Sequence, residues 1–380
     1  MSIDPFAGKL WLETPLIHSP HISTVLGCNA YLKLEVSLLQ PTPPRIPDSD
    51  SHPTTEPPTL PVLQVPRHLA FRAAHPPHTR PQRAPRHRVG GNAGLAAACA
   101  ARVLRLRCTV FLPEGVNEDV ILFMQKEGAE VIIHGQCYIQ ALKRAETAVK
   151  EEPNAVMVPA YDHPVLWEGH SSMIHEIARQ LPVGARPTAI FCSVGGGGLA
   201  GGIMQGCKAV GWDDVSFVTL ETHGSNCFYQ SLEQNPGPFP EGPSPPQEGV
   251  QIERDSDHGV AVAHLPKLTS LATSLGASSP AAGIPDELAI QAALFLRDHK
   301  MIVELACAAT LAAAYRPILF EKLVPPSPTG ARRTAVFIVC GGFKITLREM
   351  EEYRRIIEAD MWRGGNWKVL CNGAQWDTPK

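Results

Sequence analysis

The sequence predicts an α/β protein of two lobes, each built on a mostly parallel sheet flanked by helices. Two observations predict this class. Short apolar strands alternate with helical segments at the spacing of parallel βαβ units, and glycine turns follow several of the strands. With 380 residues and 44% hydrophobic content, the chain can bury two linked cores.

The charge and the cysteines narrow the function class. A formal net charge of -3 gives no field that would attract nucleic acid or an anionic membrane, and no apolar run is long enough to span a bilayer. The N-terminus lacks the basic-then-apolar order of a secretory signal, and the ten cysteines contain no CxxC pair. We therefore expect a cytoplasmic protein with reduced thiols that acts on a small molecule, without nucleic-acid or membrane partners.

The large lobe is expected to comprise residues 1–35 and 164–360, beginning with a short strand at 30–35. Its further predicted elements are a helix over 172–181, a strand at 189–194, a helix over 199–210, a strand at 215–221, helices over 288–299 and 306–320, and a strand at 334–340. The last strand is apolar up to Cys340, which suits a sheet covered on both faces. The tail 361–380 carries no pattern that predicts an element.

Two segments of different character lie between these parts. Residues 36–88 contain thirteen prolines, seven arginines, five histidines and no lysine, and this density of proline predicts a disordered segment. Residues 89–163 form the predicted small lobe. Its helices are expected over 95–106, 119–129 and 140–152, and its strands at 108–113 and 130–135.

The strongest local signal is the run Gly195, Gly196, Gly197, Gly198 between a predicted strand and a predicted helix. Glycines there let backbone N–H groups close around a phosphate at the helix N-terminus. A tight turn without a ligand is the alternative, but four consecutive glycines give up much chain entropy for a turn alone.

A dinucleotide site is a competing interpretation of the same run. Gly196, Gly198 and Gly201 satisfy the GxGxxG pattern, and Glu221 ends the next strand about twenty residues on, where a dinucleotide-binding fold places a carboxylate. An NAD-dependent oxidoreductase is therefore a second hypothesis. It explains neither of the two other glycine turns, at 90–94 and 340–342.

These three turns occur in the order GGNAG (90–94), GGGG (195–198) and CGG (340–342). Together with the segments ETPLI, YLKLE, DHPVLWEGHSS, ETHGSNCF and SLATSLGA, they resemble the serine/threonine dehydratase family of fold-type II pyridoxal-phosphate (PLP) enzymes. The resemblance covers residues 10–35 and 89–360. It implies a two-lobed, tryptophan synthase beta-like fold, and an L-serine or L-threonine ammonia-lyase that eliminates water to give pyruvate or 2-oxobutyrate and ammonia.

The resemblance also implies roles for individual residues. The cofactor phosphate would lie on Gly195 to Gly198 and the N–H of Leu199, with Asn92 facing the ring hydroxyl and Cys340 beside the pyridine nitrogen. The amino-acid substrate would contact Gly90, Gly91, Ala93, Gly94 and Ala277. A buried cysteine at a strand end remains the alternative for Cys340.

Two further expectations follow from the resemblance. Glu221 and Ser225 match the place where the family binds a monovalent cation, and a solvated or helix-capping glutamate is the alternative there. Family members commonly form homodimers, so we expect a homodimer here.

One part of the family pattern is missing. The family follows its YLKLE-like strand with an SGSFKxRG-type turn, whose lysine forms the Schiff base with PLP, whereas Glu35 is followed here by VSLLQPTPPRIPDSD and no lysine occurs between Lys33 and Lys126. Lys33 matches a structural strand position. We therefore expect no catalytic Schiff-base lysine, and a chain that is inactive as written. A non-catalytic PLP-binding or phosphate-binding relic, or a mis-spliced product in which residues 36–88 replace the true segment, is the alternative to a working enzyme.

Overall fold

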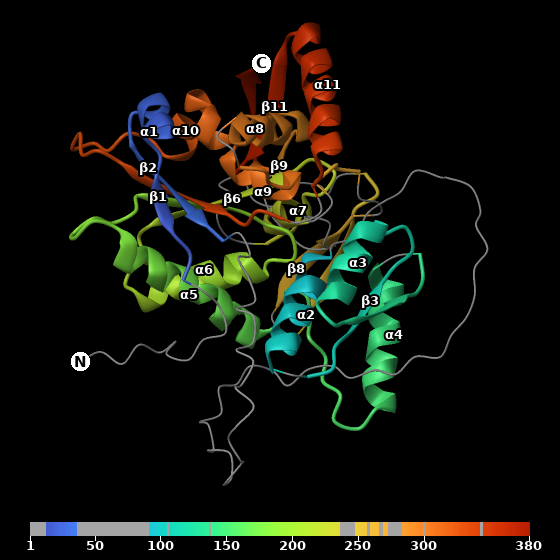
Figure 1. Cartoon of the computed structure of the whole chain (residues 1–380). Coiled ribbons are helices and arrows are strands. Elements are labelled where there is room, and N and C mark those ends of the chain that lie inside the picture. Colours follow the sequence, from blue (N-terminus) through green and yellow to red (C-terminus); the bar gives the residue numbers. More distant parts are fainter. Residues whose placement is uncertain are drawn as a thin grey trace, which may run out of the picture.

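The computed structural model describes residues 13–35, 91–104, 106–136, 138–235, 248–256, 259–265, 269–272, 283–298, 301–342 and 345–380. The proline-rich segment 36–88, which the sequence predicts to be disordered, lies outside these residues. Two lobes are visible in Figure 1, with the small lobe formed by the cyan and green segments α2 to α4.

The large lobe is built on a six-stranded sheet in the order β1-β2-β10-β5-β6-β9. Only β1 is antiparallel to its neighbour. The strands are β1 (Leu16–His18), β2 (Asn29–Leu34), β5 (Ala189–Ser193), β6 (Ser216–Thr222), β9 (Gly283–Ile284) and β10 (Thr334–Val339). The predicted mostly parallel α/β class is therefore confirmed.

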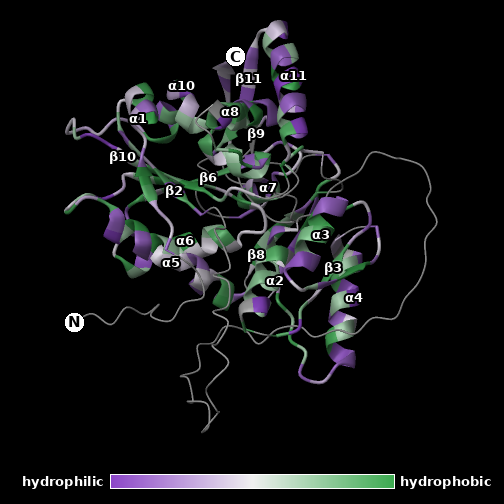
Figure 2. Cartoon of the chain, viewed as in Figure 1, coloured by the Kyte–Doolittle hydropathy of each residue, from purple (hydrophilic) through white to green (hydrophobic). Residues whose placement is uncertain are grey.

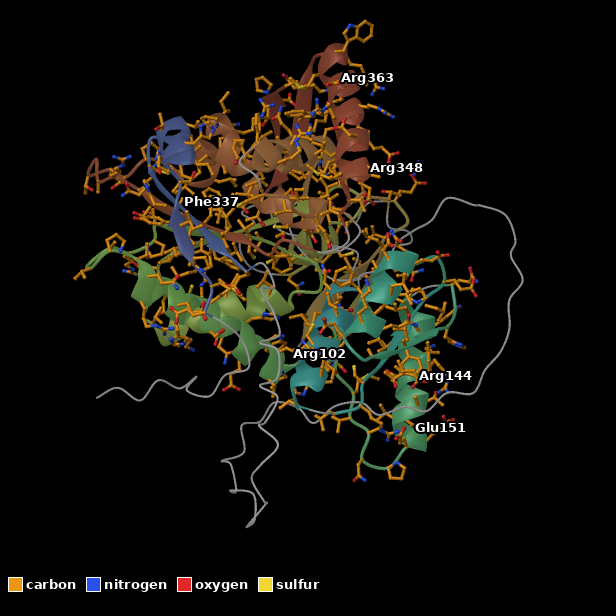
Figure 3. The ribbon with its side chains drawn as sticks, in the orientation of Figure 1. Arg102, Arg144, Glu151, Phe337, Arg348 and Arg363 are labelled. Atoms are coloured by element: carbon orange, nitrogen blue, oxygen red, sulfur yellow. The ribbon has the colours of Figure 1, made fainter. Side chains whose placement is uncertain are left out.

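Helices cover both faces of this sheet (Figure 1). One face packs on α5 (Pro164–Gln180) and α6 (Gly198–Ala209), and the other on α1 (Pro20–Leu26), α8 (Asp286–Asp298), α9 (Leu305–Ala308), α10 (Pro317–Leu323) and α11 (Leu347–Arg363). Every side chain of β5 and β10 is buried, as their apolar sequences predict. Figure 2 shows the hydrophobic colour along β2, β6 and β10. In Figure 3, Phe337 of β10 lies inside the lobe while Arg348 and Arg363 of α11 lie at its surface.

The small lobe contains the parallel pair β3 (Thr109–Leu112) and β4 (Glu130–Ile133) with the helices α2 (Asn92–Leu104), α3 (Glu118–Lys126) and α4 (Tyr138–Glu151). Its core is a separate cluster of buried side chains that includes Val110, Val120 and Met124. Figure 3 labels Arg102 on α2 and Arg144 and Glu151 on α4. The core of this lobe contains fewer buried apolar side chains than the cores of the large lobe.

The remaining elements extend the large lobe. Helix α7 (Cys227–Glu233) follows β6, and the antiparallel hairpin of β7 (Gln251–Asp255) and β8 (Val260–His264) packs on it. A second antiparallel hairpin, β11 (Asn366–Cys371) with β12 (Ala374–Pro379), lies in the C-terminal tail, where the sequence predicts no element.

The prediction of one continuous helix over 306–320 is wrong. The chain forms α9, then two short 3-10 segments, and then α10, which starts at Pro317. Arg316 has φ -135° and ψ 88°, outside the helical region, because a following proline disfavours helical backbone at the residue before it. None of the helices in the described ranges is both long and apolar enough to cross a bilayer.

Candidate active site

The glycine run forms an open turn at the carboxyl end of β5. Gly195 to Gly197 follow the strand, Gly197 has φ 83°, and α6 begins at Gly198. Within the described part of the chain, the first backbone N–H after Val194 with an acceptor is that of Gly201, which donates to the Gly197 carbonyl over 2.8 Å. The amides from Gly195 to Ala200 are therefore available to an anion at the start of a helix.

Close packing explains why these positions are glycines. A Cβ on Gly198 would lie 2.4 Å from the backbone oxygen of Tyr161, and one on Gly196 would lie 2.1 Å from Cγ of the Tyr161 ring. Four residues further along α6, a Cβ on Gly202 would lie 2.3 Å from the Cβ of His170 in α5. The glycines thus hold α6 against α5 and bring Tyr161 onto the turn.

Cys340 lies beside this turn. β10 and β5 are parallel neighbours, so the residues that follow them meet at one edge of the sheet. Burial raises the pKa of the Cys340 thiol well above its ordinary value, and the nearby groups Cys307, Glu35 and Glu304 raise it further. The thiol is therefore neutral at physiological pH, as the resemblance implies for a partner of a pyridine nitrogen.

Glu304 connects the two lobes at this edge. Its backbone N–H donates to the Gly341 carbonyl over 2.9 Å, and its side chain occupies the space that a Cβ on Gly342 would fill. Its carboxylate accepts a 3.3 Å hydrogen bond from the side-chain amide of Asn92 at the start of α2. The structure thereby brings Asn92 together with the Cys340 turn.

The other predicted substrate contacts are placed only in part. Gly91 and Ala93 flank Asn92, and the Gly91 carbonyl accepts from the N–H of Leu95 over 2.9 Å. A Cβ on Gly94 would lie 2.7 Å from Cγ1 of Val110, so this glycine also lets α2 approach β3. Gly90 and Ala277 lie outside the described residues.

Lys33 is the lysine next to the missing segment, and its partners hold it in place. Its side chain is fully buried. The ammonium Nζ lies 2.5 Å from Oε2 of Glu176, 2.6 Å from the Thr14 carbonyl and 3.5 Å from Oε1 of Glu35. An amine that donates to a carboxylate and a backbone carbonyl in a buried site is not free to act as a nucleophile. These contacts hold Lys33 in the packing of β2 and make it a poor substitute for the missing lysine.

Glu221 and Ser225 lie together between β6 and α7. The Glu221 carboxylate accepts long, 3.4 Å hydrogen bonds from the N–H groups of Phe228 and Tyr229, and burial raises its pKa well above the ordinary value. Among the described residues, no basic side chain lies within 4 Å of it. The hydroxyl of Ser225 is also buried and has no hydrogen-bond partner in this part of the chain.

This placement weakens the dinucleotide alternative. A ribose diol needs an accessible carboxylate at the end of the second strand, whereas Glu221 is 1% exposed and turned towards the backbone of α7. Two of the three GxGxxG glycines, Gly196 and Gly198, are explained by their close contacts with Tyr161 instead.

Sequence reasoning missed Glu304, Tyr161 and the cluster of Thr14, Lys33 and Glu176. Glu304 follows the apolar residues Met301 to Val303, and nothing in this local sequence indicates that it contacts the glycine turn at Gly342. The family-like segment DHPVLWEGHSS begins directly after Tyr161 and includes the start of α5, so it was the only sequence feature that pointed to this region.

Comparisons with known proteins agree with this geometry. The family described as "Pyridoxal-phosphate dependent enzyme" matches residues 88–341. "Serine dehydratase-like" of Mus musculus is 36% identical over 281 residues, covering 70% of this chain and 77% of the relative. "L-serine dehydratase/L-threonine deaminase" of Bos taurus is 31% identical over 373 residues, covering 92% and 97%. The crystal structure of a fungal L-serine ammonia-lyase from Rhizomucor miehei aligns with a TM-score of 0.65 at 25% identity, covering 91% and 98%.

Proposed function

The chain belongs to the pyridoxal-phosphate dependent enzymes, in the serine/threonine ammonia-lyase family, and from this premise we propose that it binds PLP and an amino acid but does not turn the amino acid over. The proposal rests on two observations: a phosphate-binding turn is present, and the lysine that the family needs is absent from the sequence. Free backbone amides at Gly195 to Leu199 stand ready for a phosphate, while the sequence holds no lysine between Lys33 and Lys126.

The described residues fit the non-covalent half of the cofactor's requirements. The glycine turn offers N–H donors to a dianionic phosphate at a helix N-terminus. The protonated Cys340 thiol would lie beside the ring nitrogen, and the Asn92 amide would turn from Glu304 to the ring hydroxyl. When bound, PLP supplies an electron sink for charge at the substrate α-carbon.

The covalent half of those requirements is not met. The family chemistry needs an amine that joins the cofactor and later moves a proton, and Lys33 is held by Glu176 and Thr14 in the rigid end of β2. Loss of such a group lowers rates by several orders of magnitude. The amino acid remains the proposed ligand, its carboxylate at the amides of Gly91 and Ala93.

Three finer expectations complete the proposal. A monovalent cation would bind at Glu221 and Ser225, where it would offset the burial that raises the pKa of the Glu221 carboxyl group and would give the buried Ser225 hydroxyl a partner. We place the protein in the cytoplasm, supported by nine described cysteines that are all free thiols. We also propose that it forms a homodimer, which sedimentation of the purified chain would test.

We further propose that residues 36–88 are not the evolved product of this gene. The sequence changes abruptly after Glu35 and returns to the family pattern near Val89. Sequencing the mature transcript tests this idea: a message that encodes an SGSFK-type turn supports it. Abundant messages with these codons, together with peptides from the segment in the purified protein, would rule it out.

The functional proposal is tested with the purified chain, PLP and L-serine. We expect PLP to bind at micromolar concentration and pyruvate formation to stay at the rate of free PLP in solution. A matched chimera, in which residues 36–88 are exchanged for the corresponding segment of a relative, should gain pyruvate formation. Pyruvate formation by the unaltered chain at the chimera's rate would refute the proposal.

A further inference from the structure

Within the part of the chain that the structure describes, the outer edge of β6 is largely unpaired. On its inner edge, the Ser216 N–H donates to the Thr188 carbonyl and the Leu220 carbonyl accepts from Val194. Because successive residues of a strand point their backbone groups to opposite edges, Phe217 and Thr219 face outwards. On that side β9 pairs only with Glu221 and Thr222. Among the described residues, no partner takes the backbone groups of Phe217 and Thr219.

A second free edge faces the same space. In the β11–β12 hairpin the N–H of Lys380 donates to the Gly365 carbonyl, so the odd-numbered residues of β11 face β12 and the even-numbered ones face away. Consistent with this, the Lys368 carbonyl is 2.9 Å from Nε2 of His223, just beyond the end of β6. The backbone of Leu370 points to the same side.

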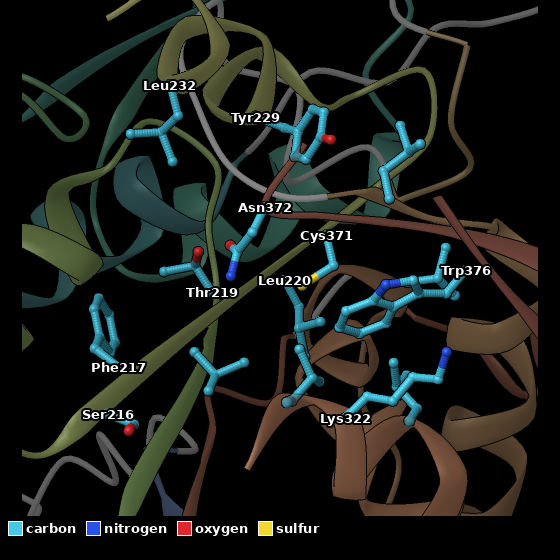
Figure 4. A pocket seen from close by; sticks show the side chains of 15 residues that line it. Ser216, Phe217, Thr219, Leu220, Tyr229, Leu232, Lys322, Cys371, Asn372 and Trp376 are labelled. Carbon is cyan, nitrogen blue, oxygen red and sulfur yellow. The ribbon is translucent and has the colours of Figure 1, made fainter. Parts of the chain in front are cut away.

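A cavity of about 410 Å³ separates these two edges (Figure 4). Its lining includes residues 216–220 of β6 and residues 369–372 around the end of β11. Tyr229 and Leu232 of α7 and Leu319 and Leu323 of α10 complete its walls. The space therefore has a strand edge on two sides and a helix on two others.

These are the boundaries of a position for one more strand. We propose that this cavity, here called the strand slot, accepts an extended peptide from a partner protein, which pairs with β6 and continues the row that β9 begins. Unpaired backbone groups at a sheet edge bind peptides in this way, with apolar walls that receive alternate side chains. A compact apolar ligand would fill the volume but leave the backbone groups of Phe217 and Thr219 unsatisfied.

The charge of the slot defines the chemistry of the peptide. Lys322 is the only basic residue among the described residues that line the slot, and its Nζ lies 4.8 Å from the centre of the Trp376 ring. No acidic side chain is among the lining residues, and no carboxylate of the described chain lies within 4 Å of this ammonium. We therefore expect a peptide with apolar residues at alternate positions and one acidic residue near Lys322.

The chain's own sequence before β9 is poorly suited to the slot. In the parallel ladder of β5 and β6, each β6 carbonyl accepts from the residue after its partner, as Leu220 does from Val194. Continued along the β9 register, the carbonyl of Phe217 would need the N–H of residue 280, which is proline. Serines and alanines around it would also leave much of the apolar volume empty.

The test uses the full chain and a dye-labelled, acetylated and amidated hexapeptide, Ser-Val-Thr-Val-Glu-Ser, with fluorescence anisotropy as the measurement. We expect saturable binding to the wild type. A peptide with both valines N-methylated keeps its side chains but loses ladder hydrogen bonds, and should bind at least about tenfold more weakly. Lys322→Gln should weaken binding of this peptide by about fivefold, but it should not change the binding of a peptide with glutamine in place of the glutamate.

Lys143→Gln is the matched control, because Lys143 is an exposed lysine of α4 in the other lobe. It should bind both peptides as the wild type does. The proposal is overturned if the wild type does not bind the peptide. That result is expected if a second copy or another part of this chain fills the slot. Equal binding of the N-methylated peptide would overturn it as well.

Discussion

The side-chain amide of Asn92 donates a hydrogen bond of 3.3 Å to the carboxylate of Glu304, and this contact joins the small lobe to the large one. Glu304 is 7% exposed and packs against the glycine turn that follows Cys340. Asn92, which we propose to contact the cofactor, is therefore hydrogen-bonded to Glu304 when no ligand is bound. PLP bound as we propose would exchange this hydrogen bond of Asn92 for one to the ring hydroxyl.

The first prediction concerns this pair. Asn92→Ala and Glu304→Gln should show a coupling free energy of about 0.5–1.5 kcal/mol in a double-mutant cycle of urea unfolding, since they share a hydrogen bond that includes a charged acceptor. Asn92→Ala should also weaken PLP binding. Strictly additive effects on unfolding would show that the contact contributes nothing to stability.

The second prediction contrasts two glycines of α6. Gly198→Ala places a Cβ 2.4 Å from a backbone oxygen of Tyr161, which cannot move without the chain, so the variant should lose about 1–3 kcal/mol of unfolding free energy and bind PLP weakly. Gly201→Ala places its Cβ 3.6 Å from the Trp167 ring, an ordinary contact. That control should gain about 0.5–1 kcal/mol from helix propensity. Equal stability of the two variants would contradict the close approach.

The third prediction addresses the buried ammonium of Lys33. Lys33→Met leaves the carboxylates of Glu176 and Glu35 without it, and should lower the unfolding free energy by about 3–5 kcal/mol. The double variant Lys33→Met/Glu176→Gln removes one stranded charge and should recover part of the loss. A single variant as stable as the wild type would mean that the ion pair is not formed in solution.

The fourth prediction uses the pH dependence of stability. Burial raises the folded-state pKa of Glu221, so its contribution is fully present below the unfolded value near 4.5 and is lost as pH rises through the folded pKa. Glu221→Gln should remove this loss, and so be more stable than the wild type at pH 7 in a buffer without metal cations. Urea unfolding between pH 4 and pH 8 measures the difference.

The cation proposal adds a control to that experiment. Potassium chloride should raise the melting temperature of the wild type at pH 7 more than tetramethylammonium chloride does at equal ionic strength, because only the small cation enters a buried site. Glu221→Gln should respond to both salts alike. The same response of the wild type to both salts would leave Glu221 as a buried, unpaired carboxyl group with no cation.

Local sequence patterns predicted much of the fold. The strands β5 and β10 are apolar apart from Ser193 and Thr334 at their ends, and parallel strands buried on both faces have that composition. Glycine turns marked where their carboxyl ends meet. The break between α9 and α10 was missed, although Pro317 stood in the sequence, because the alanine-rich run before it has high helix propensity.

Contacts between distant residues were not predictable. Asn92 and Glu304 are separated by 212 positions, and Tyr161 contacts a glycine turn more than thirty positions further along the chain. Neither contact has periodicity or spacing that marks it. The hairpin of β11 and β12 was not predicted because each six-residue strand has a single tryptophan between polar residues, which is too short a pattern to indicate a strand.

We propose that this chain keeps the phosphate-binding turn of its family without an amine to anchor the cofactor. Borohydride reduction of the PLP-saturated protein, followed by denaturation and mass spectrometry, tests it most directly. We predict that PLP is bound before denaturation and released in full afterwards, with every lysine unmodified. A lysine peptide carrying the reduced cofactor in stoichiometric yield, or protein that never binds PLP, would contradict the claim.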